Sequence, residues 1–259
     1  MSNIQSAERV SQHDASDNYV FQRSLLAYHE AAKLVAGDVL EIGTGSGYGV
    51  EIMAPRVESF TTVDKFDAGI DLSPWPNARF LQMNVPPLAN FAAGSFDYVI
   101  SFQVIEHIRH DFTLVDEVWR VLRSGGRFIV TTPNALMSLT RNPWHVREYT
   151  PDQLMGLLSS RFSQVEPLGV FGNDKVMEYY EKNRESVRRI TRFDPLKLQY
   201  RLPRWMLQLP YDLLNRMNRR KLLRENSTLT TGIRMEDYRL DKVSDNCFDL
   251  FYMATKAEE

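Results

Sequence analysis

The sequence has a single cysteine, Cys247, and it lacks any long run of apolar side chains. One thiol cannot form an internal disulfide or a cysteine-based zinc cluster, which is typical of a protein from a reducing compartment. No apolar stretch approaches the ~20 residues that a helix needs to cross a bilayer. The first eighteen residues are polar and of mixed charge, unlike a secretory signal. The sequence therefore predicts a cytoplasmic protein without a transmembrane segment.

The sequence also lacks a strong overall charge of either sign. Its formal net charge is -2, with 43% hydrophobic and 25% charged residues, which is the balance of an ordinary globular protein. Disorder of the whole chain is therefore excluded, and no overall field points to nucleic acid as a partner. A length of 259 residues suits one large domain, or one domain with a sizeable insertion.

Charge is unevenly distributed within the chain. Residues 182–224 contain thirteen Lys or Arg and three Asp or Glu, a local net charge of +10, so the remainder carries about -12. The same segment is rich in leucine and contains Trp205. Pro195, Pro203 and Pro210 predict that it forms short helices rather than one long helix.

Apolar segments of strand length alternate with helical patterns over the first 170 residues. This alternation predicts right-handed crossover units and a parallel β-sheet. Helices are predicted at residues 19–35, 50–54, 111–123 and 150–160, and strands at residues 38–42, 59–63, 80–83, 96–102, 127–132, 162–168 and 247–254.

The predicted sixth and seventh strands are far apart in the sequence. We therefore interpret residues 1–171 and 247–259 as one α/β domain. Residues 172–246 are interpreted as a basic helical insertion between these two strands, which serves as a lid or as part of an acceptor-binding site.

A glycine-rich turn with Gly43, Gly45 and Gly47 follows the first predicted strand. It does not fit the dinucleotide fingerprint, because a tyrosine occupies the position of the third glycine, and it has no P-loop lysine. Glu41, two residues before the turn, is unfavourable near a pyrophosphate but suits a cationic or amine-bearing ligand. Asp64 ends the second strand, where a carboxylate accepts hydrogen bonds from ribose hydroxyls. A ribose and a positive charge without phosphate are features of S-adenosylmethionine.

Four segments in this order resemble the class I S-adenosylmethionine-dependent methyltransferases, in particular the type 11 methyltransferases and the ubiquinone-biosynthesis O-methyltransferases. The resemblance covers roughly residues 35–170. It implies a three-layer Rossmann-like sandwich with a seven-stranded, mostly parallel sheet whose last strand is antiparallel. The matching segments are residues 39–47, 63–64, 96–100 and 117–128.

The resemblance implies a cofactor site for S-adenosylmethionine at the carboxyl ends of the first strands. The glycine turn and Glu41 would surround the methionine moiety, and Asp64 would bind the ribose. Asn84 stands where the family usually has an acidic residue near the adenine amino group, and its carbonyl oxygen can accept from that group. The predicted cofactor-binding residues are Glu41, Gly43, Thr44, Gly45, Gly47, Asp64, Lys65, Asn84, Val85, Phe102 and Gln103.

Glu106, His107 and His145 are the predicted catalytic residues. The first two follow the fourth strand and His145 follows the fifth, at the sheet edge where open parallel sheets bind their ligands. If a helix begins after the fourth strand, Gln103, Glu106 and His107 share one of its faces. A histidine in this place can act as the general base that removes a proton from an acceptor hydroxyl.

Two other interpretations of these residues are open. Glu106, His107 and His145 could hold a divalent metal ion that lowers the pKa of the acceptor. The segment resembles a Glu-x-x-Glu-His element of metal-dependent ubiquinone-biosynthesis and small-RNA 2′-O-methyltransferases, although Gln103 replaces the first glutamate. Alternatively, Glu106 and His107 only cap and position a helix, and His145 packs within its loop.

The sequence thus predicts an S-adenosylmethionine-dependent methyltransferase, with a small-molecule acceptor that is methylated on oxygen rather than on nitrogen or carbon. The alternatives are a non-catalytic binding or scaffold protein that keeps the cofactor fold, and an RNA methyltransferase. The basic insertion is interpreted first as a lid. It is interpreted second as a surface for an anionic or lipid-linked acceptor or for a peripheral membrane contact, and last as a nucleic-acid surface, because it has no stacking platform.

Overall fold

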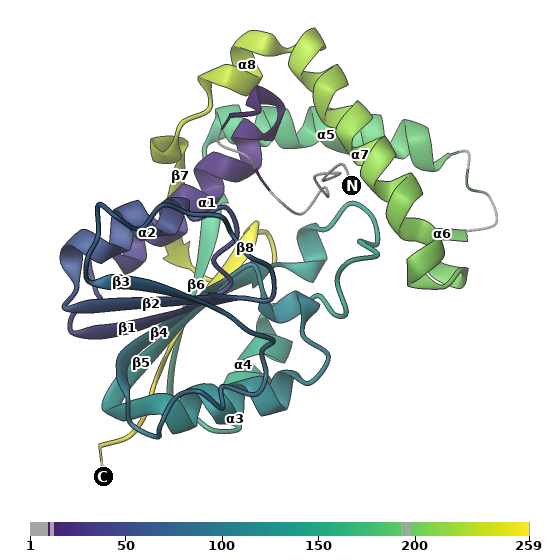
Figure 1. Ribbon diagram of the computed structural model, residues 1–259. Coiled ribbons are helices and arrows are strands. Elements are labelled where there is room, and N and C mark those ends of the chain that lie inside the picture. The colour runs from purple at the N-terminus through teal and green to yellow at the C-terminus, as the bar shows by residue number, and fades with distance from the viewer. Residues whose placement is uncertain (1–9, 11–12, 193, 195–197, 259) are drawn as a thin grey trace.

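The computed structural model describes residues 10, 13–192, 194 and 198–258. Figure 1 shows a twisted sheet between helices, with a further group of helices above it. The strands are β1 (Asp38–Ile42), β2 (Ser59–Asp64), β3 (Ala78–Gln82), β4 (Phe96–Phe102), β5 (Leu122–Pro133), β6 (Gln164–Gly172), β7 (Tyr238–Lys242) and β8 (Asp249–Thr255). The α-helices are α1 (Asn18–Ala31), α2 (Tyr48–Met53), α3 (Asp111–Val121), α4 (Pro151–Ser159), α5 (Asp174–Thr191), α6 (Leu198–Arg201), α7 (Arg204–Glu225) and α8 (Ser227–Gly232).

The strand order in the sheet is β3-β2-β1-β4-β5-β8-β6-β7. Strands β1 to β5 pair in parallel, β8 runs antiparallel to both β5 and β6, and β7 runs antiparallel to β6. The order reverses between β1 and β4, and open α/β sheets bind their ligands beyond the carboxyl ends of such strands. The predicted α/β class, with its mostly parallel sheet and antiparallel C-terminal strand, is confirmed.

Two hydrophobic cores lie on opposite faces of the sheet, because successive strand residues point to opposite sides. Val39 of β1 belongs to the core beneath α1 and α2, whereas the adjacent Leu40 belongs to the core beneath α3 and α4. In β5, Ile129 faces the first core and its neighbours Phe128 and Val130 face the second. Strands that are buried on both faces read as continuous apolar segments, which is why they could be predicted from the sequence.

The sheet has one strand more than the seven predicted. β7 comes from the predicted insertion and pairs with β6 at the edge of the sheet. Its sequence contains three charged residues, and Tyr238 is its one fully buried residue. Charged edge strands of this kind limit unwanted pairing with other chains, and they also lack the apolar pattern that predicts a strand. The division of the chain at residue 172 and residue 246 stays a prediction.

The helices of the insertion are longer than predicted. Helix α5 spans 18 residues and α7 spans 22, and α7 continues through Pro210. The prediction that Pro210 breaks the helix is therefore wrong, because one lost backbone hydrogen bond near the start of a long helix does not end it. Pro203 does immediately precede α7, as predicted, whereas Pro195 lies outside the described residues.

Polar contacts join the insertion to the first helix. The buried Asp17 carboxylate lies 2.8 Å from Arg216 and 2.7 Å from Arg219, both on α7. The Asn18 amide donates to the carbonyl oxygens of Thr230 and Ile233 at 2.8 and 2.9 Å. Helix α7 is thereby held over the same face of the sheet as α1. None of the helices in the described part of the chain combines the length and hydropathy needed to span a membrane.

Candidate active site

The glycine turn after β1 lies against the segment that follows β4. Gly43 has φ 97°, and a Cβ atom there would come within 2.3 Å of the Val104 side chain, so this position requires glycine. Gly45 has φ 58°, and no atom lies within 4 Å of the position that its Cβ would take. The turn therefore touches the β4 segment on one side and leaves open space beside Gly45, where a ligand can approach the backbone.

Asp64, at the end of β2, lies beside this turn. Its two carboxylate oxygens accept the backbone N–H groups of Gly45 at 3.1 Å and of Phe66 at 3.0 Å. Each oxygen keeps a further lone pair that can accept a ribose hydroxyl. The structure thus brings together Gly45 and Asp64, two predicted cofactor residues from adjacent strands, and their chemistry fits the ribose of S-adenosylmethionine.

Glu41 of β1 is buried and does not face open space. Its carboxylate accepts hydrogen bonds from the Tyr28 and Thr62 hydroxyls, both at 2.5 Å. Burial raises the pKa of Glu41 to about 7, against the opposing effect of these two hydrogen bonds. The Thr62 hydroxyl also lies 2.6 Å from that of Thr44, so Glu41 and Thr44 support the glycine turn from below. Their contact with the cofactor stays a prediction.

The remaining predicted cofactor residues follow β2, β3 and β4. Lys65 and Asn84 are exposed, and Val85 is half-buried beside Asn84. Phe102 is buried, with its ring packed edge-to-face on Tyr28 at 4.8 Å between centroids. These residues lie at the carboxyl ends of β2, β3 and β4, and their individual contacts with a cofactor stay predictions.

Gln103 follows β4 directly and has φ 58°, in the left-handed region that a residue other than glycine rarely adopts. Its backbone N–H donates to Thr131 of β5 at 2.9 Å, and its side-chain amide donates to the Thr131 hydroxyl at 3.3 Å. The residues after it form a short 3-10 turn, Ile105–His107, instead of an α-helix. The expectation that Gln103 shares a helical face with Glu106 and His107 is therefore wrong.

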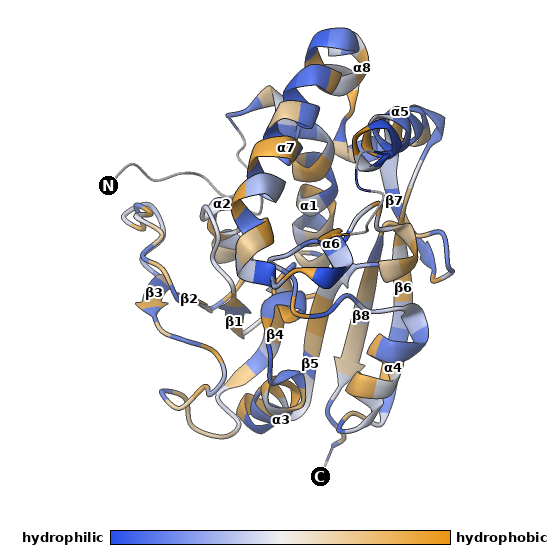
Figure 2. Ribbon diagram, turned by 90° about the vertical axis from the view of Figure 1, so that its right-hand side faces the viewer, coloured by the Kyte–Doolittle hydropathy of each residue, from blue (hydrophilic) through white to orange (hydrophobic). Residues whose placement is uncertain are grey.

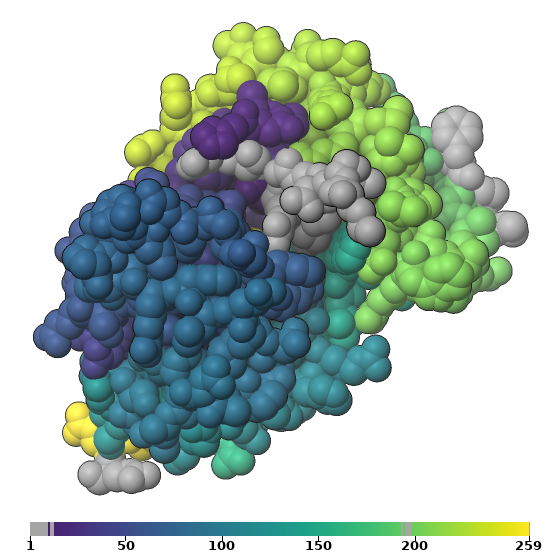
Figure 3. All heavy atoms as spheres, in the orientation of Figure 1, coloured from purple at the N-terminus to yellow at the C-terminus, as the bar shows by residue number. Residues whose placement is uncertain are grey.

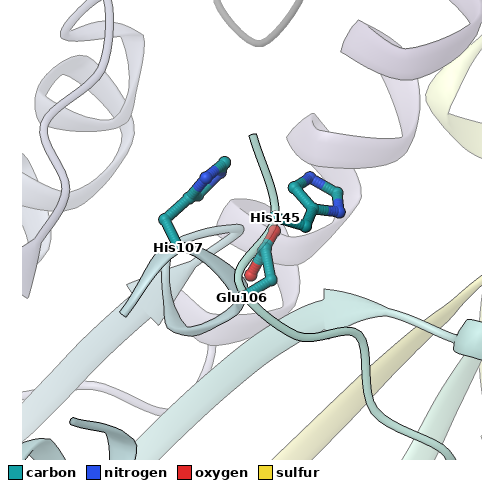
Figure 4. A group of neighbouring side chains, drawn as sticks. All are labelled: Glu106, His107 and His145. Atoms are coloured by element: carbon teal, nitrogen blue, oxygen red, sulfur yellow. The ribbon is translucent and has the colours of Figure 1, made fainter. Parts of the chain in front are cut away.

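The three predicted catalytic residues do meet in space. One ligand atom each of Glu106, His107 and His145 lie within 4.8 Å of one another, and Figure 4 shows the carboxylate between the two imidazoles. The ring centroids of the two histidines are 4.9 Å apart. Glu106 is buried, and its carboxylate accepts a hydrogen bond from Thr132 at 3.0 Å. Its backbone oxygen accepts the N–H group of Val146 at 2.7 Å, which fixes the loop that carries His145.

The hydrogen-bond partners of the two histidines indicate their tautomers. His107 Nδ1 lies 3.1 Å from the carbonyl oxygen of Trp144, which can only accept, so Nδ1 carries the proton. His145 Nδ1 lies 2.7 Å from a carboxylate oxygen of Glu148, and its Nε2 lies 2.8 Å from the amide nitrogen of Asn142. In its neutral form each imidazole carries the lone pair on Nε2, where it can accept a proton or bind a metal ion. The Nε2 lone pair of His145 accepts a hydrogen bond from the Asn142 amide.

Glu148 and Asn142 were not predicted as functional residues. They lie three residues after and three before His145, so the local spacing could have indicated both. A second unpredicted feature is the buried ion pair of Arg23 and Asp249, with 2.9 Å between its atoms. Burial raises the pKa of Asp249, opposed by Arg23 and by a hydrogen bond from Gln103. Arg23 and Asp249 are more than two hundred residues apart, and no local pattern connects them.

A large cavity lies between the sheet edge and the insertion. Its volume is about 1540 Å³, and its walls come from α1, the segment after β5, α5 and α7. His145 and Glu148 line it together with Arg23, while Met206 and Leu214 of α7 add apolar surface. Figure 3 shows the insertion (green) standing above the sheet domain (blue and teal). The cavity therefore combines an imidazole base, charged groups and an apolar wall.

One carboxylate and two imidazoles are also a donor set that suits a divalent transition metal. The carboxylate that holds His145 Nδ1 resembles the outer partners that orient metal-bound histidines. The metal interpretation is therefore compatible with the described side chains, alongside the interpretation as a general base.

Known proteins that are similar in sequence to this chain are described as methyltransferases. Residues 40–130 match a family model described as a methyltransferase domain. A probable S-adenosylmethionine-dependent methyltransferase of Mycolicibacterium smegmatis is 36% identical over 166 residues, which cover 61% of this chain and 64% of the relative. Another, from Mycobacterium tuberculosis, is 33% identical over 171 residues and 62% of each chain. The chain thus matches less than two thirds of the length of these relatives.

More distant matches are also described as methyltransferases. A ubiquinone biosynthesis O-methyltransferase of Pseudomonas aeruginosa is 28% identical over 120 residues, or 44% of this chain and 49% of the relative. A crystal structure from Thermotoga maritima, described as a possible histamine N-methyltransferase, covers 92% of both chains with a TM-score of 0.55 and 14% identity, which shows the fold alone. Over residues 40–130 the chain is therefore similar to methyltransferase domains, and it shares the α/β Rossmann-like fold of this solved structure.

Proposed function

We propose that this chain is an S-adenosylmethionine-dependent methyltransferase that methylates a hydroxyl group of a small-molecule acceptor. The observation that carries the proposal is the meeting of two sites at one sheet edge. Gly43 packs against Val104, which stands two residues before Glu106 in the catalytic cluster. The cofactor turn and the two histidines are therefore neighbours, and proximity of donor and acceptor is the main requirement of a displacement reaction.

The residues around the glycine turn would hold the cofactor. S-adenosylmethionine supplies a methyl group activated by a positively charged sulfonium. The open space beside Gly45 admits a ligand to the backbone, and the Asp64 carboxylate offers acceptors for both ribose hydroxyls. The curated relatives from mycobacteria are described as dependent on the same cofactor, which supports this assignment.

His145 is the better placed of the two candidate bases. An acceptor hydroxyl has to lose its proton near the transition state, and the Nε2 lone pair of His145 can take it. The imidazolium that results is stabilised by the Glu148 carboxylate, 2.7 Å from Nδ1. His107 Nδ1 faces the neutral Trp144 carbonyl at 3.1 Å, and a neutral carbonyl stabilises a positive charge less than a carboxylate does. His145 also lines the cavity, where an acceptor hydroxyl would displace Asn142 from Nε2.

The cavity indicates the size and character of the acceptor. Its volume of about 1540 Å³ exceeds the ~300–1,000 Å³ of ordinary ligand pockets. Asn142 and His145 at one wall suit a polar group, and Met206 and Leu214 at another suit an apolar part. We infer that the insertion acts as a lid over a large amphiphilic acceptor, and that α5 and α7 select it.

Calorimetric titration with S-adenosylmethionine and S-adenosylhomocysteine tests the cofactor assignment. Asp64→Ala removes hydrogen bonds to a charged acceptor, worth about 1.5–3 kcal/mol each, so we expect the Kd to rise roughly 10- to 100-fold for each bond that is lost. Asp67→Ala is the matched control, because Asp67 is an exposed aspartate of the same segment. Wild-type protein that binds neither ligand, or an Asp64→Ala variant that binds as tightly as the control, would overturn the proposal.

A further inference from the structure

Helix α7 carries an apolar stripe on its solvent side. Trp205, Leu209, Leu213 and Met217 are 73%, 70%, 62% and 57% exposed. They follow one another at intervals of four residues, so they lie along one face of the helix. Figure 2 shows α7 at the surface of the molecule, with hydrophobic segments along its length. A contiguous exposed apolar surface of this kind marks an interaction site.

Arginines continue the same stripe. Arg220 and Arg224 are exposed and lie three and seven residues after Met217, on the same side of the helix. By contrast, Arg216 and Arg219 are mostly buried against Asp17 and hold the helix in place. The exposed side of α7 is therefore apolar over its first turns and basic over its last turns, where Met217, Arg220 and Arg224 also border the large cavity.

We propose that α7 docks on an anionic membrane surface. The apolar stripe would enter the boundary between headgroups and acyl chains, and Arg220 and Arg224 would contact lipid phosphates. Charge complementarity supports this occupant, because residues 182–224 carry a local charge of +10 in a chain whose net charge is -2. Tryptophan is enriched at the membrane–water interface, and Trp205 is the most exposed large apolar residue of the stripe.

The same charge disfavours a second copy of the chain as the occupant. A symmetric dimer through α7 would bring two segments of charge +10 together, and like charges across an interface oppose association. An anionic bilayer has no such penalty. Because Met206 and Leu214 of α7 also line the large cavity, docking through this helix would place the cavity next to the bilayer.

Co-sedimentation of the full chain with lipid vesicles tests the proposal. We expect binding to vesicles of phosphatidylcholine mixed with phosphatidylglycerol, little binding to phosphatidylcholine alone, and weaker binding as salt is raised. Leu209→Glu and Leu213→Glu should each weaken binding by about tenfold or more, since each removes a buried leucine from the membrane-bound state. Arg220→Glu combined with Arg224→Glu should abolish the preference for anionic lipid.

Phe112→Glu is the matched control for the leucine variants. Phe112 belongs to α3 and is 57% exposed, so the change adds the same charge at a similarly exposed apolar residue away from α7. Thermal denaturation and S-adenosylmethionine titration of each variant check that the fold and the cofactor site are intact, which keeps this test separate from that of the proposed function. Equal binding of wild type and Leu209→Glu would overturn the proposal, as would a wild-type chain that binds no anionic vesicles or that dimerises through α7.

Discussion

Glu41 makes stability depend on pH in a direction opposite to that of most carboxylates. Its pKa lies at about 7 in the folded protein, raised chiefly by burial from the usual 4.5. The folded state therefore keeps the proton over a pH range in which the unfolded state loses it. Because the folded state binds more protons there, the free energy of unfolding falls as pH rises from 4.5 to 7 and is level above.

The size of the effect follows from the difference between the two pKa values. At 1.36 kcal/mol per pKa unit, a rise from 4.5 to about 7 corresponds to about 3 kcal/mol of lost stability. Glu41→Gln removes this term because glutamine cannot ionise. The substitution keeps the hydrogen bonds, since its carbonyl can accept from Tyr28 and its amide can donate to Thr62, which can donate onward to Thr44.

Urea denaturation of wild type and Glu41→Gln at a series of pH values measures the effect. The difference in unfolding free energy between the two proteins should change by about 3 kcal/mol between pH 4.5 and pH 8, in favour of the variant at high pH. Glu58→Gln, which removes an exposed carboxylate, corrects for the change in net charge. A difference between wild type and Glu41→Gln that stays constant with pH would refute the assignment of a buried, protonated Glu41.

Four further substitutions, in two pairs, test the site. His145→Ala should lower the transfer of labelled methyl groups to a small-molecule extract by roughly 10²–10⁴-fold without weakening cofactor binding. Glu148→Gln should lower the same transfer by a smaller factor. Mild losses of transfer in both variants would indicate a nitrogen acceptor. Gly47→Ala should destabilise the protein more than Gly45→Ala in urea denaturation. Both positions have positive φ, which costs roughly 1–2 kcal/mol for alanine, but only the Cβ at residue 47 would come within 2.2 Å of Ile70. Equal losses at the two glycines would contradict the close contact with Ile70.

The strands of the central sheet could be predicted because the sequence pattern that indicates each of them lies within the strand and its flanking turns. β1 and β4 are apolar segments bounded by turn residues, and each is buried on both faces. β7 has no such pattern, since it lies at the edge and only Tyr238 is fully buried. The prediction that Pro210 ends a helix failed for a different reason. A proline removes one backbone hydrogen bond, which is a local effect, whereas the length of α7 depends on its contacts with distant elements.

The site was predictable to the extent that its residues belong to short motifs. The glycine turn and Asp64 follow adjacent strands, so a parallel sheet places them together. The clustering of His107 with His145 needed only the knowledge that β4 and β5 are neighbours. Arg23 and Asp249 come from opposite ends of the chain, and no spacing rule in the sequence could pair them.

The net charge of -2 is the sum of a basic segment, residues 182–224, and an acidic remainder of the chain. Part of the positive charge of the insertion is structural, because Arg216 and Arg219 neutralise Asp17, which is fully buried. Breaking a buried ion pair costs roughly 3–5 kcal/mol, so these arginines are held and are not available to a partner. Arg220 and Arg224, one and two turns beyond Arg216, stay exposed. The contacts of each arginine on α7 therefore decide which of them can serve an anionic surface.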